Sequence, residues 1–195
     1  IILILVITIT LCVNLDGVIN AVLEGEDIGL TMEQIKSYIP KIYFQIVIYT
    51  ACMTSITSSS ISLEGKSLYI LKTIPIETRK IFKAKIITSN IITIPIMFVS
   101  EIIFFIIFRP KIKDIIFILL ATIIMPTLTA VIGLLVNLKH PKLNASSDTE
   151  VVKQSASSGI SVLIGMVLGM VSIVTAVIFY NSIDLCYIIE LTILT

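Results

Sequence analysis

Few residues of this chain have the types and spacing that catalysis requires, and they do not form a recognised set. The single histidine, His140, lies in a His-Pro-Lys sequence without a second His or Cys nearby, whereas an intramembrane metalloprotease needs a pattern such as H-E-x-x-H. No G-x-S-x-G sequence or Ser/His pair occurs within an apolar run. Glu64-Gly65-Lys66-Ser67 ends like a phosphate-binding loop but lacks its first glycine. The sequence therefore predicts no enzyme and no metal site, and if ATP drives the protein, another chain binds it.

A single acid inside an apolar run is the first candidate for transport chemistry. Glu101 lies about two helical turns before the end of its run, where an unpaired carboxylate is unfavourable. We expect this side chain to face other helices, where it finds a donor or takes up a proton as part of a transport path. The competing interpretation is an ion pair with Arg109 or Lys111 at the membrane edge.

Gln45, Thr50 and Thr54 are further candidates for a transport path. They belong to residues 42–61, the most polar of the long apolar runs, which holds several other Ser and Thr residues. Such a stripe either lines a polar path or forms hydrogen bonds with carbonyl groups of neighbouring helices. The sequence leaves both interpretations open.

These side chains must be positioned by membrane helices, because the composition excludes a soluble domain. Apolar residues make up 56% of the 195 residues and charged residues only 14%, which is more apolar surface than one soluble core of this length can bury. The net charge of +1 gives no reason to expect nucleic acid as a partner. Cys12, Cys52 and Cys186 form no C-x-x-C pair, so we expect packing roles for them.

We expect one all-α, polytopic transmembrane domain over residues 1–195, cut from a longer protein at both ends. A span needs about 20 apolar residues, which predicts complete spans at 42–61, 86–108, 115–138 and 160–180 and partial spans at 1–13 and 185–195. Lipid offers no partners to backbone groups, so helices are expected instead of strands. Gly165 and Gly169 form a G-x-x-x-G pattern that favours close helix packing over a specific dimer seam. Pro95 and Pro126 should kink their spans.

Residues 62–85 form a basic amphipathic stretch that we expect to lie on the cytoplasmic face of a cell membrane. On a helical wheel Leu63, Ile70 and Ile74 share one side and Lys72 lies opposite, which is typical of an interfacial helix. Placing 62–85 and the loop 139–159 inside puts nine of the fourteen Lys and Arg residues in the cytoplasm. Three positive charges in the outer turn 109–114 disagree with this orientation.

Three segments of the sequence resemble one family. Residues 60–76, SISLEGKSLYILKTIPI, resemble the cytoplasmic "S-x-E-G-K, aromatic, I-L-K" segment of bacterial ATP-binding-cassette type-2 exporter permeases. Residues 133–144, GLLVNLKHPKLN, and 150–155, EVVKQS, resemble the "G-L-x-x-[ND]-L-x-x-P-K-L-x-W, E-x-x-V-K-Q-S" loop in the carboxyl-terminal half of the same permeases. The chain departs from the family at Ala145, where an aromatic residue is common, and at Glu77-Thr78, which replaces the Ser-Pro that opens the next helix.

The resemblance implies a permease subunit that pairs with a separate ABC ATPase and exports a solute. The segment expected to contact that ATPase contains Glu64, Gly65, Lys66, Leu71, Lys72 and Pro75. From the residues alone, Gly65 permits a tight reversal, Lys66 and Lys72 can meet acids or lipid phosphates, and Pro75 ends the interfacial helix. No cofactor is expected on this chain, since ATP and Mg²⁺ would bind the partner. Membrane lipid and a second permease copy or half are further expected partners, and a non-transporting scaffold or assembly subunit is the main alternative function.

Overall fold

The computed structural model describes residues 2–14, 17, 32–54, 56–65, 73, 75–142, 149, 151–152, 155–178 and 191–192. These residues are largely helical and include no β-strand, so the predicted all-α fold is confirmed. The elements in chain order are α1 Ile2–Val13, α3 Met32–Cys52, the 3-10 helix η1 Ile56–Ser59, α5 Thr78–Phe108, α6 Ile112–Lys139 and α8 Ala156–Ile178.

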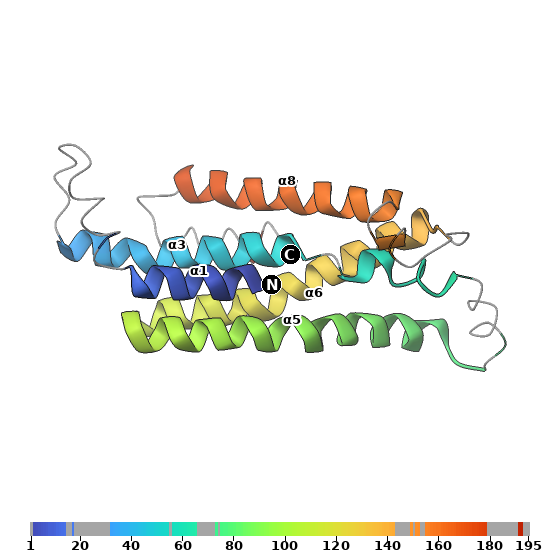
Figure 1. Ribbon diagram of the computed structural model, residues 1–195, viewed down its shortest axis with the longest axis horizontal. Helices are drawn as coiled ribbons and strands as arrows, with labels where there is room; N and C mark the ends of the chain where they lie inside the picture. The colour runs from blue at the N-terminus through green and yellow to red at the C-terminus, as the bar shows by residue number, and fades with distance from the viewer. Residues whose placement is uncertain are drawn as a thin grey trace.

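The helices run side by side along the long axis of the molecule (Figure 1). Helices α3, α5, α6 and α8 alternate in direction along this axis. Helix α6 contacts α3, α5, α8 and η1 and so lies at the centre of the bundle, whereas α1 packs on α5 and α3. Residues 56–65 lie at one end of the bundle, together with the start of α5, the end of α6 and the start of α8. We call this end of the bundle the junction end. The opposite end, where α5 is followed by α6, is the Arg109 end.

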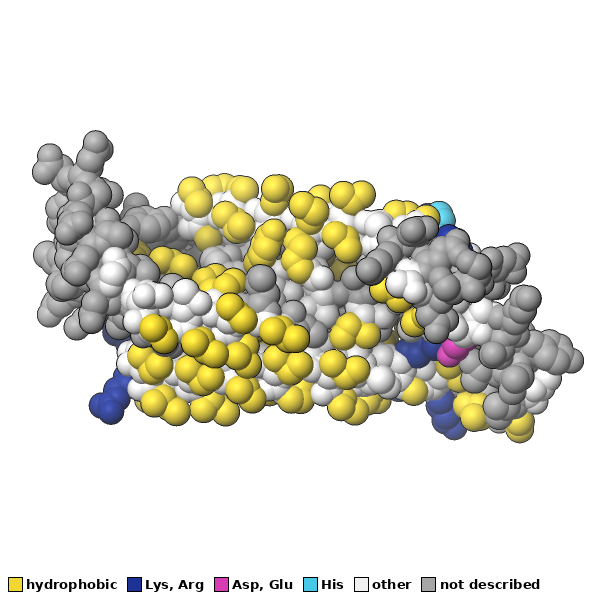
Figure 2. Space-filling model, in the orientation of Figure 1, with side chains coloured by type: hydrophobic (Ala, Val, Ile, Leu, Met, Phe, Trp, Pro, Cys, Tyr) yellow, Lys and Arg dark blue, Asp and Glu magenta, His cyan; other side chains and the backbone are white. Residues whose placement is uncertain are grey.

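The surface of the bundle is apolar along most of its length. Within the described residues, the segments long and apolar enough to cross a membrane are Tyr38–Ser59, Thr78–Phe108, Ile112–Lys139 and Ala156–Ile178. Figure 2 shows hydrophobic side chains over the middle of the visible face and Lys and Arg side chains toward both ends. Ile91, Ile106 and Val177 are 66%, 68% and 71% exposed, an arrangement that suits lipid chains and not water. The chain is therefore a multi-pass membrane protein.

The core lies between α3, α5 and α6. Tyr43 of α3 stacks on Phe104 of α5 with ring centroids 3.8 Å apart, and Phe108 stacks on the same ring at 4.6 Å. Met97 and Met125 fill adjacent space and are almost fully buried. In lipid, where apolar burial does not drive helix association, such close packing holds helices together.

The polar run predicted as one span over 42–61 is not a continuous helix. Helix α3 ends at Cys52, and the chain continues through η1 to a series of turns that reaches Glu64. Hydroxyl groups in this run bond to nearby backbone carbonyls and compete with helical geometry: Thr54 Oγ1 donates to Thr50 O at 3.1 Å, and Ser60 Oγ to Thr57 O at 3.0 Å. Non-helical backbone is tolerated at this depth because it is buried against protein.

The basic stretch 62–85 contains a non-helical break after the predicted helix end at Pro75, and the helix that follows starts earlier than the predicted span. Residues 75–77 are not helical, and α5 begins at Thr78, eight residues before the predicted start of the span at 86. Pro75 disfavours helical geometry at the preceding residue, whereas residues 78–86 contain no helix breaker and continue directly into the apolar part of α5. Residues 66–72 and 74, which include most of the predicted interfacial helix, lie outside the described residues.

Candidate functional site

All hydrogen-bonding positions of the Asn137 side chain, two residues before the end of α6, are used within the described part of the bundle. Its Oδ1 accepts hydrogen bonds from the backbone N–H groups of Ile61 at 2.8 Å and Ser62 at 3.1 Å. Its Nδ2 donates to Ser62 Oγ at 2.8 Å and to Ser157 Oγ at 2.9 Å. The residue is 0% exposed, and these four bonds use both donors and both acceptor positions of the amide.

The cluster around Asn137 extends into the loop after α6 and the start of α8. Ser62 Oγ also accepts from the backbone N–H of Lys142 at 3.0 Å. Ser155 Oγ lies 3.1 Å from Ser157 Oγ and accepts from the backbone N–H of Ser158 at 3.2 Å, which is the position of a helix N-cap for α8. We call Ser62, Asn137, Ser155 and Ser157 the junction cluster. It joins the turns after η1 to α6 and α8.

An ion pair joins the same turns to α5. Lys85 Nζ lies 2.6 Å from Glu64 Oε1 and also donates to the backbone carbonyl of Ser60 at 3.0 Å. The Lys85 and Glu64 side chains are 14% and 27% exposed, so solvent screens this pair less than a surface pair. Gly65, the next residue, has a φ of 47°, which glycine adopts without strain.

A glycine of α6 allows η1 to pack closely on that helix. A Cβ added at Gly133 would lie 2.6 Å from Thr57 Oγ1 and 3.2 Å from the backbone nitrogen of Ser58. Thr57 Oγ1 donates to the carbonyl of Ala130 at 2.7 Å across the same contact. The turns after α3 are therefore held against α6 at two levels, by Thr57 and by Asn137.

The residues predicted to contact an ATPase are only partly described. Glu64 and Gly65 lie at the junction end beside the junction cluster, and Pro75 is exposed in the segment that precedes α5. Lys66, Leu71 and Lys72 lie outside the described residues. Asn137 and Gly133 were not predicted as site residues; the signal for them was their place in the segment that resembles exporter permeases.

The predicted transport-path residues do not converge on one site. Glu101 of α5 is 0% exposed and accepts a hydrogen bond from Thr122 of α6. Its Oε2 has no hydrogen-bond partner among the described residues, and neither Arg109 nor Lys111 pairs with it there. The neighbouring Ser100 Oγ lies 3.2 Å from the hydroxyl of Tyr43 on α3. Glu101 thus lies in a polar layer that connects three helices through the bundle core.

The other three candidates make separate hydrogen bonds: Gln45 and Thr50 belong to α3, and Thr54 follows its end. Gln45 accepts from Ser172 Oγ of α8 at 2.5 Å. Thr50 Oγ1 donates to Ile46 O at 2.7 Å, and Thr54 Oγ1 bonds to the carbonyl of Thr50. Both threonine bonds stay within residues 46–54, whereas the second interpretation expects bonds to carbonyl groups of neighbouring helices. Thr57 of the same run makes such a bond, to Ala130 O of α6.

Gly165 and Gly169 bring α8 against α3 of the same chain. A Cβ at Gly165 would overlap the carbonyl oxygen of Cys52, and one at Gly169 would lie 2.7 Å from the ring of Tyr49. The buried face of α8 consists of small residues only, at Ser157, Ser161, Gly165, Gly169 and Ser172. Small residues let helix backbones approach closely in lipid.

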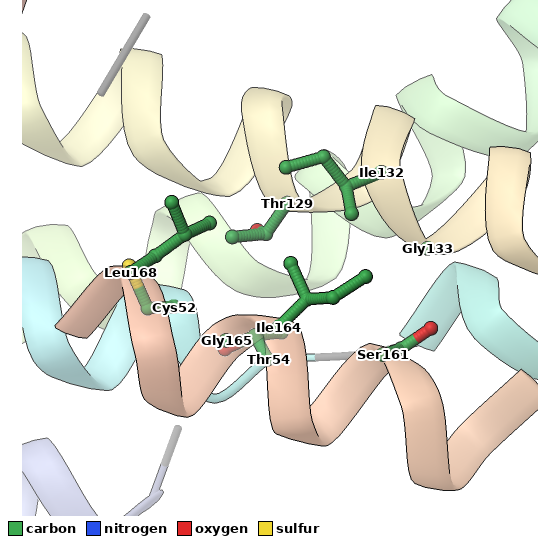
Figure 3. A pocket seen from close by; sticks show the side chains of 9 residues that line it. All are labelled: Cys52, Thr54, Thr129, Ile132, Gly133, Ser161, Ile164, Gly165 and Leu168. Carbon is green, nitrogen blue, oxygen red and sulfur yellow. The ribbon is translucent and has the colours of Figure 1, made fainter. Parts of the chain in front are cut away.

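A small cavity remains where α8, α6 and the end of α3 meet. Its lining includes Cys52, Thr54, Gly133 and Ser161, as Figure 3 shows. The cavity volume is about 10 Å³, which is no more than one water molecule needs. It is too small to serve as a solute site in this conformation.

The described residues contain no group of three His, Cys, Asp or Glu side chains that could hold a metal ion. The contacts that join helices at the junction end are neutral hydrogen bonds and the Lys85–Glu64 ion pair, which suits mechanical attachment between helices. Comparison with known proteins gives no match for this chain to a family model, a curated protein or a solved structure.

Proposed function

We propose that this chain is the transmembrane permease subunit of an ATP-driven exporter in a bacterial cell membrane, and that a separate ABC ATPase binds at the junction end. The observation that carries the proposal is the convergence of the three segments that resemble type-2 exporter permeases. Ser62 and Asn137 come from two of these segments, and Ser155 of the third joins them through Ser157. Ser62 and Asn137 are 75 positions apart in the sequence. Their contact in the fold favours a common function for the two segments to which they belong.

The junction cluster offers a way to pass a displacement into the bundle. The turns after η1 are attached to α5 by Glu64 and Lys85, to α6 by Asn137, and through that amide to α8. Buried, fully satisfied hydrogen-bond networks are rigid because each broken bond leaves an uncompensated polar group. A partner that pushes on residues 56–65 therefore acts on three spanning helices together.

The junction end faces the cytoplasm in this proposal. Its described basic residues are Arg79, Lys80, Lys83, Lys85, Lys139 and Lys142, against Lys36, Lys41, Arg109, Lys111 and Lys113 toward the other end. This excess agrees with the positive-inside rule. A membrane-impermeant maleimide should label Lys111→Cys in intact cells and His140→Cys only in inverted vesicles. The reverse pattern would remove the ATPase site from the cytoplasm and overturn the proposal.

The coupling role is tested with the full-length protein and an ABC ATPase that a neighbouring gene is expected to encode. Asn137→Ala should still co-purify with the ATPase but should lose the stimulation of ATP hydrolysis that the permease provides in liposomes. The matched control is Asn90→Ala, which removes another Asn–hydroxyl bond between α5 and α6, from Asn90 Nδ2 to Thr127 Oγ1 at 2.9 Å, outside the junction cluster. Wild-type stimulation by Asn137→Ala would contradict coupling through the junction cluster, and absence of any ATPase partner would favour the scaffold function.

A further inference from the structure

A groove opens at the junction end, between the turns after η1 and the first turns of α5. Its volume is about 680 Å³, within the range of sites that bind small ligands. Its apolar lining comes from Ile56, Leu63, Ile76, Ile81 and Ala84. The α5 wall extends from Lys80 to Ser89, about 14 Å at 1.5 Å per residue. The groove therefore runs parallel to the helices.

Three hydroxyl groups in the groove wall donate to backbone carbonyls. Thr57 Oγ1 donates to Ala130 O at 2.7 Å, Ser60 Oγ to Thr57 O at 3.0 Å, and Thr88 Oγ1 to Ala84 O at 2.9 Å. Each of these residues therefore turns its donor away from a ligand. The wall consequently suits a hydrocarbon chain better than a polar solute.

The end of the groove near Lys80 is positively charged. Lys80 lies 3.7 Å from Glu77, with the two side chains 70% and 71% exposed, so this pair is weak and its ammonium group can meet another anion. Arg79 and Lys83 are exposed on the same turns of α5, and Lys85 is held inside the groove by Glu64. Figure 2 shows Lys and Arg side chains at this end, where the apolar surface stops.

We propose that this groove binds an anionic phospholipid, with an acyl chain along the apolar wall and the phosphate at Lys80. Three observations agree on this occupant: the groove is parallel to the spanning helices, its wall is apolar, and its basic end lies where the apolar surface of the bundle stops. Basic pockets at the ends of membrane helices commonly bind anionic headgroups. The bound lipid braces the turns after η1 against α5. The proposal needs only that the chain spans a membrane, and it does not depend on the exporter function.

The lipid site is tested by native mass spectrometry of the full-length protein released from nanodiscs that contain equal amounts of phosphatidylglycerol and phosphatidylcholine. The wild type should retain phosphatidylglycerol in preference to phosphatidylcholine. Lys80→Gln should reduce that preference about fivefold, as expected for one basic residue near a headgroup. Lys111→Gln, at the Arg109 end, should leave it unchanged.

A second variant tests the apolar wall. Ala84→Phe fills the groove and should abolish lipid retention, whereas Ile87→Phe, at a position that is 55% exposed and outside the groove lining, should not. Equal retention of the two lipids by the wild type, or undiminished retention by Ala84→Phe, would overturn the proposal. If the Ala84→Phe variant no longer co-purifies with the ATPase but retains lipid as the wild type does, the groove is instead a protein-binding surface.

Discussion

Replacement of Asn137 by alanine is the most informative perturbation of the junction cluster. The change removes the acceptor of two backbone N–H groups, those of Ile61 and Ser62, in turns where these residues are 6% and 2% exposed. Each buried donor left without a partner costs about 1–3 kcal/mol. The two together predict a loss of about 2–6 kcal/mol in the free energy of unfolding. The hydroxyls of Ser62 and Ser157 add little, since each keeps another partner.

Asn137→Asp separates the acceptor role from the donor role. The carboxylate still accepts from both backbone N–H groups, and the Ser62 and Ser157 hydroxyls can turn to donate to its second oxygen. We therefore expect Asp to lower the stability less than Ala does.

Unfolding is measured by titration with sodium dodecyl sulfate in mild detergent, followed by the reactivity of the buried Cys52 thiol, because the chain has no Trp. Asn90→Ala, which loses a single hydrogen bond, should cost only about 0.5–1.5 kcal/mol. If Asn137→Ala destabilises the protein no more than Asn90→Ala does, the junction cluster does not hold the helices together.

Three further changes test other parts of the bundle. Gly133→Ala should lower the free energy of unfolding by about 1–3 kcal/mol in the same titration, because its Cβ would lie 2.6 Å from Thr57 Oγ1. The control is Gly159→Ala, since a Cβ at Gly159 would have nothing within 4 Å. Equal effects of the two changes would argue against close packing of η1 on α6. Glu101→Gln should keep or raise the unfolding midpoint, since it preserves a partner for Thr122 and removes a buried carboxylate with an unpaired oxygen; a large loss would mean that an ionised carboxylate is stabilised there. A double-mutant cycle of Glu64→Gln and Lys85→Met should give a coupling energy above about 0.5 kcal/mol, because neither side chain is more than a third exposed, and zero coupling would remove the link between the turns and α5.

The spanning helices could be predicted from apolar runs, but some of their ends could not. The end of α5 at Phe108 coincides with the predicted boundary, because the run stops at Arg109-Pro110. Its start at Thr78 was missed because hydropathy detects the part of a helix that faces lipid and not the charged turns that continue beyond it. Hydropathy also cannot detect that the Ser and Thr hydroxyls after Cys52 bond to the backbone and end α3.

The junction cluster was beyond sequence reasoning for a different reason. A lone Asn at the end of an apolar run is an ordinary observation, and its two backbone partners lie 76 and 75 positions away in the chain. Only the packing of η1 on α6 through Gly133 brings those partners within reach. Resemblance identified the three segments separately, whereas their contact is a property of the folded bundle.

The separation in sequence between Asn137 and its backbone partners also affects the order in which this region can fold during translation. When residues 56–65 leave the ribosome, the acceptor for the Ile61 N–H lies 76 residues further along the chain. At about 5–20 residues per second, it is synthesised about 4–15 s later. During that interval water is the natural partner for these N–H groups, since lipid offers none. The turns are therefore expected to stay at the membrane surface until α6 is inserted, so that translation of α6 sets when this part of the protein can enter the bundle.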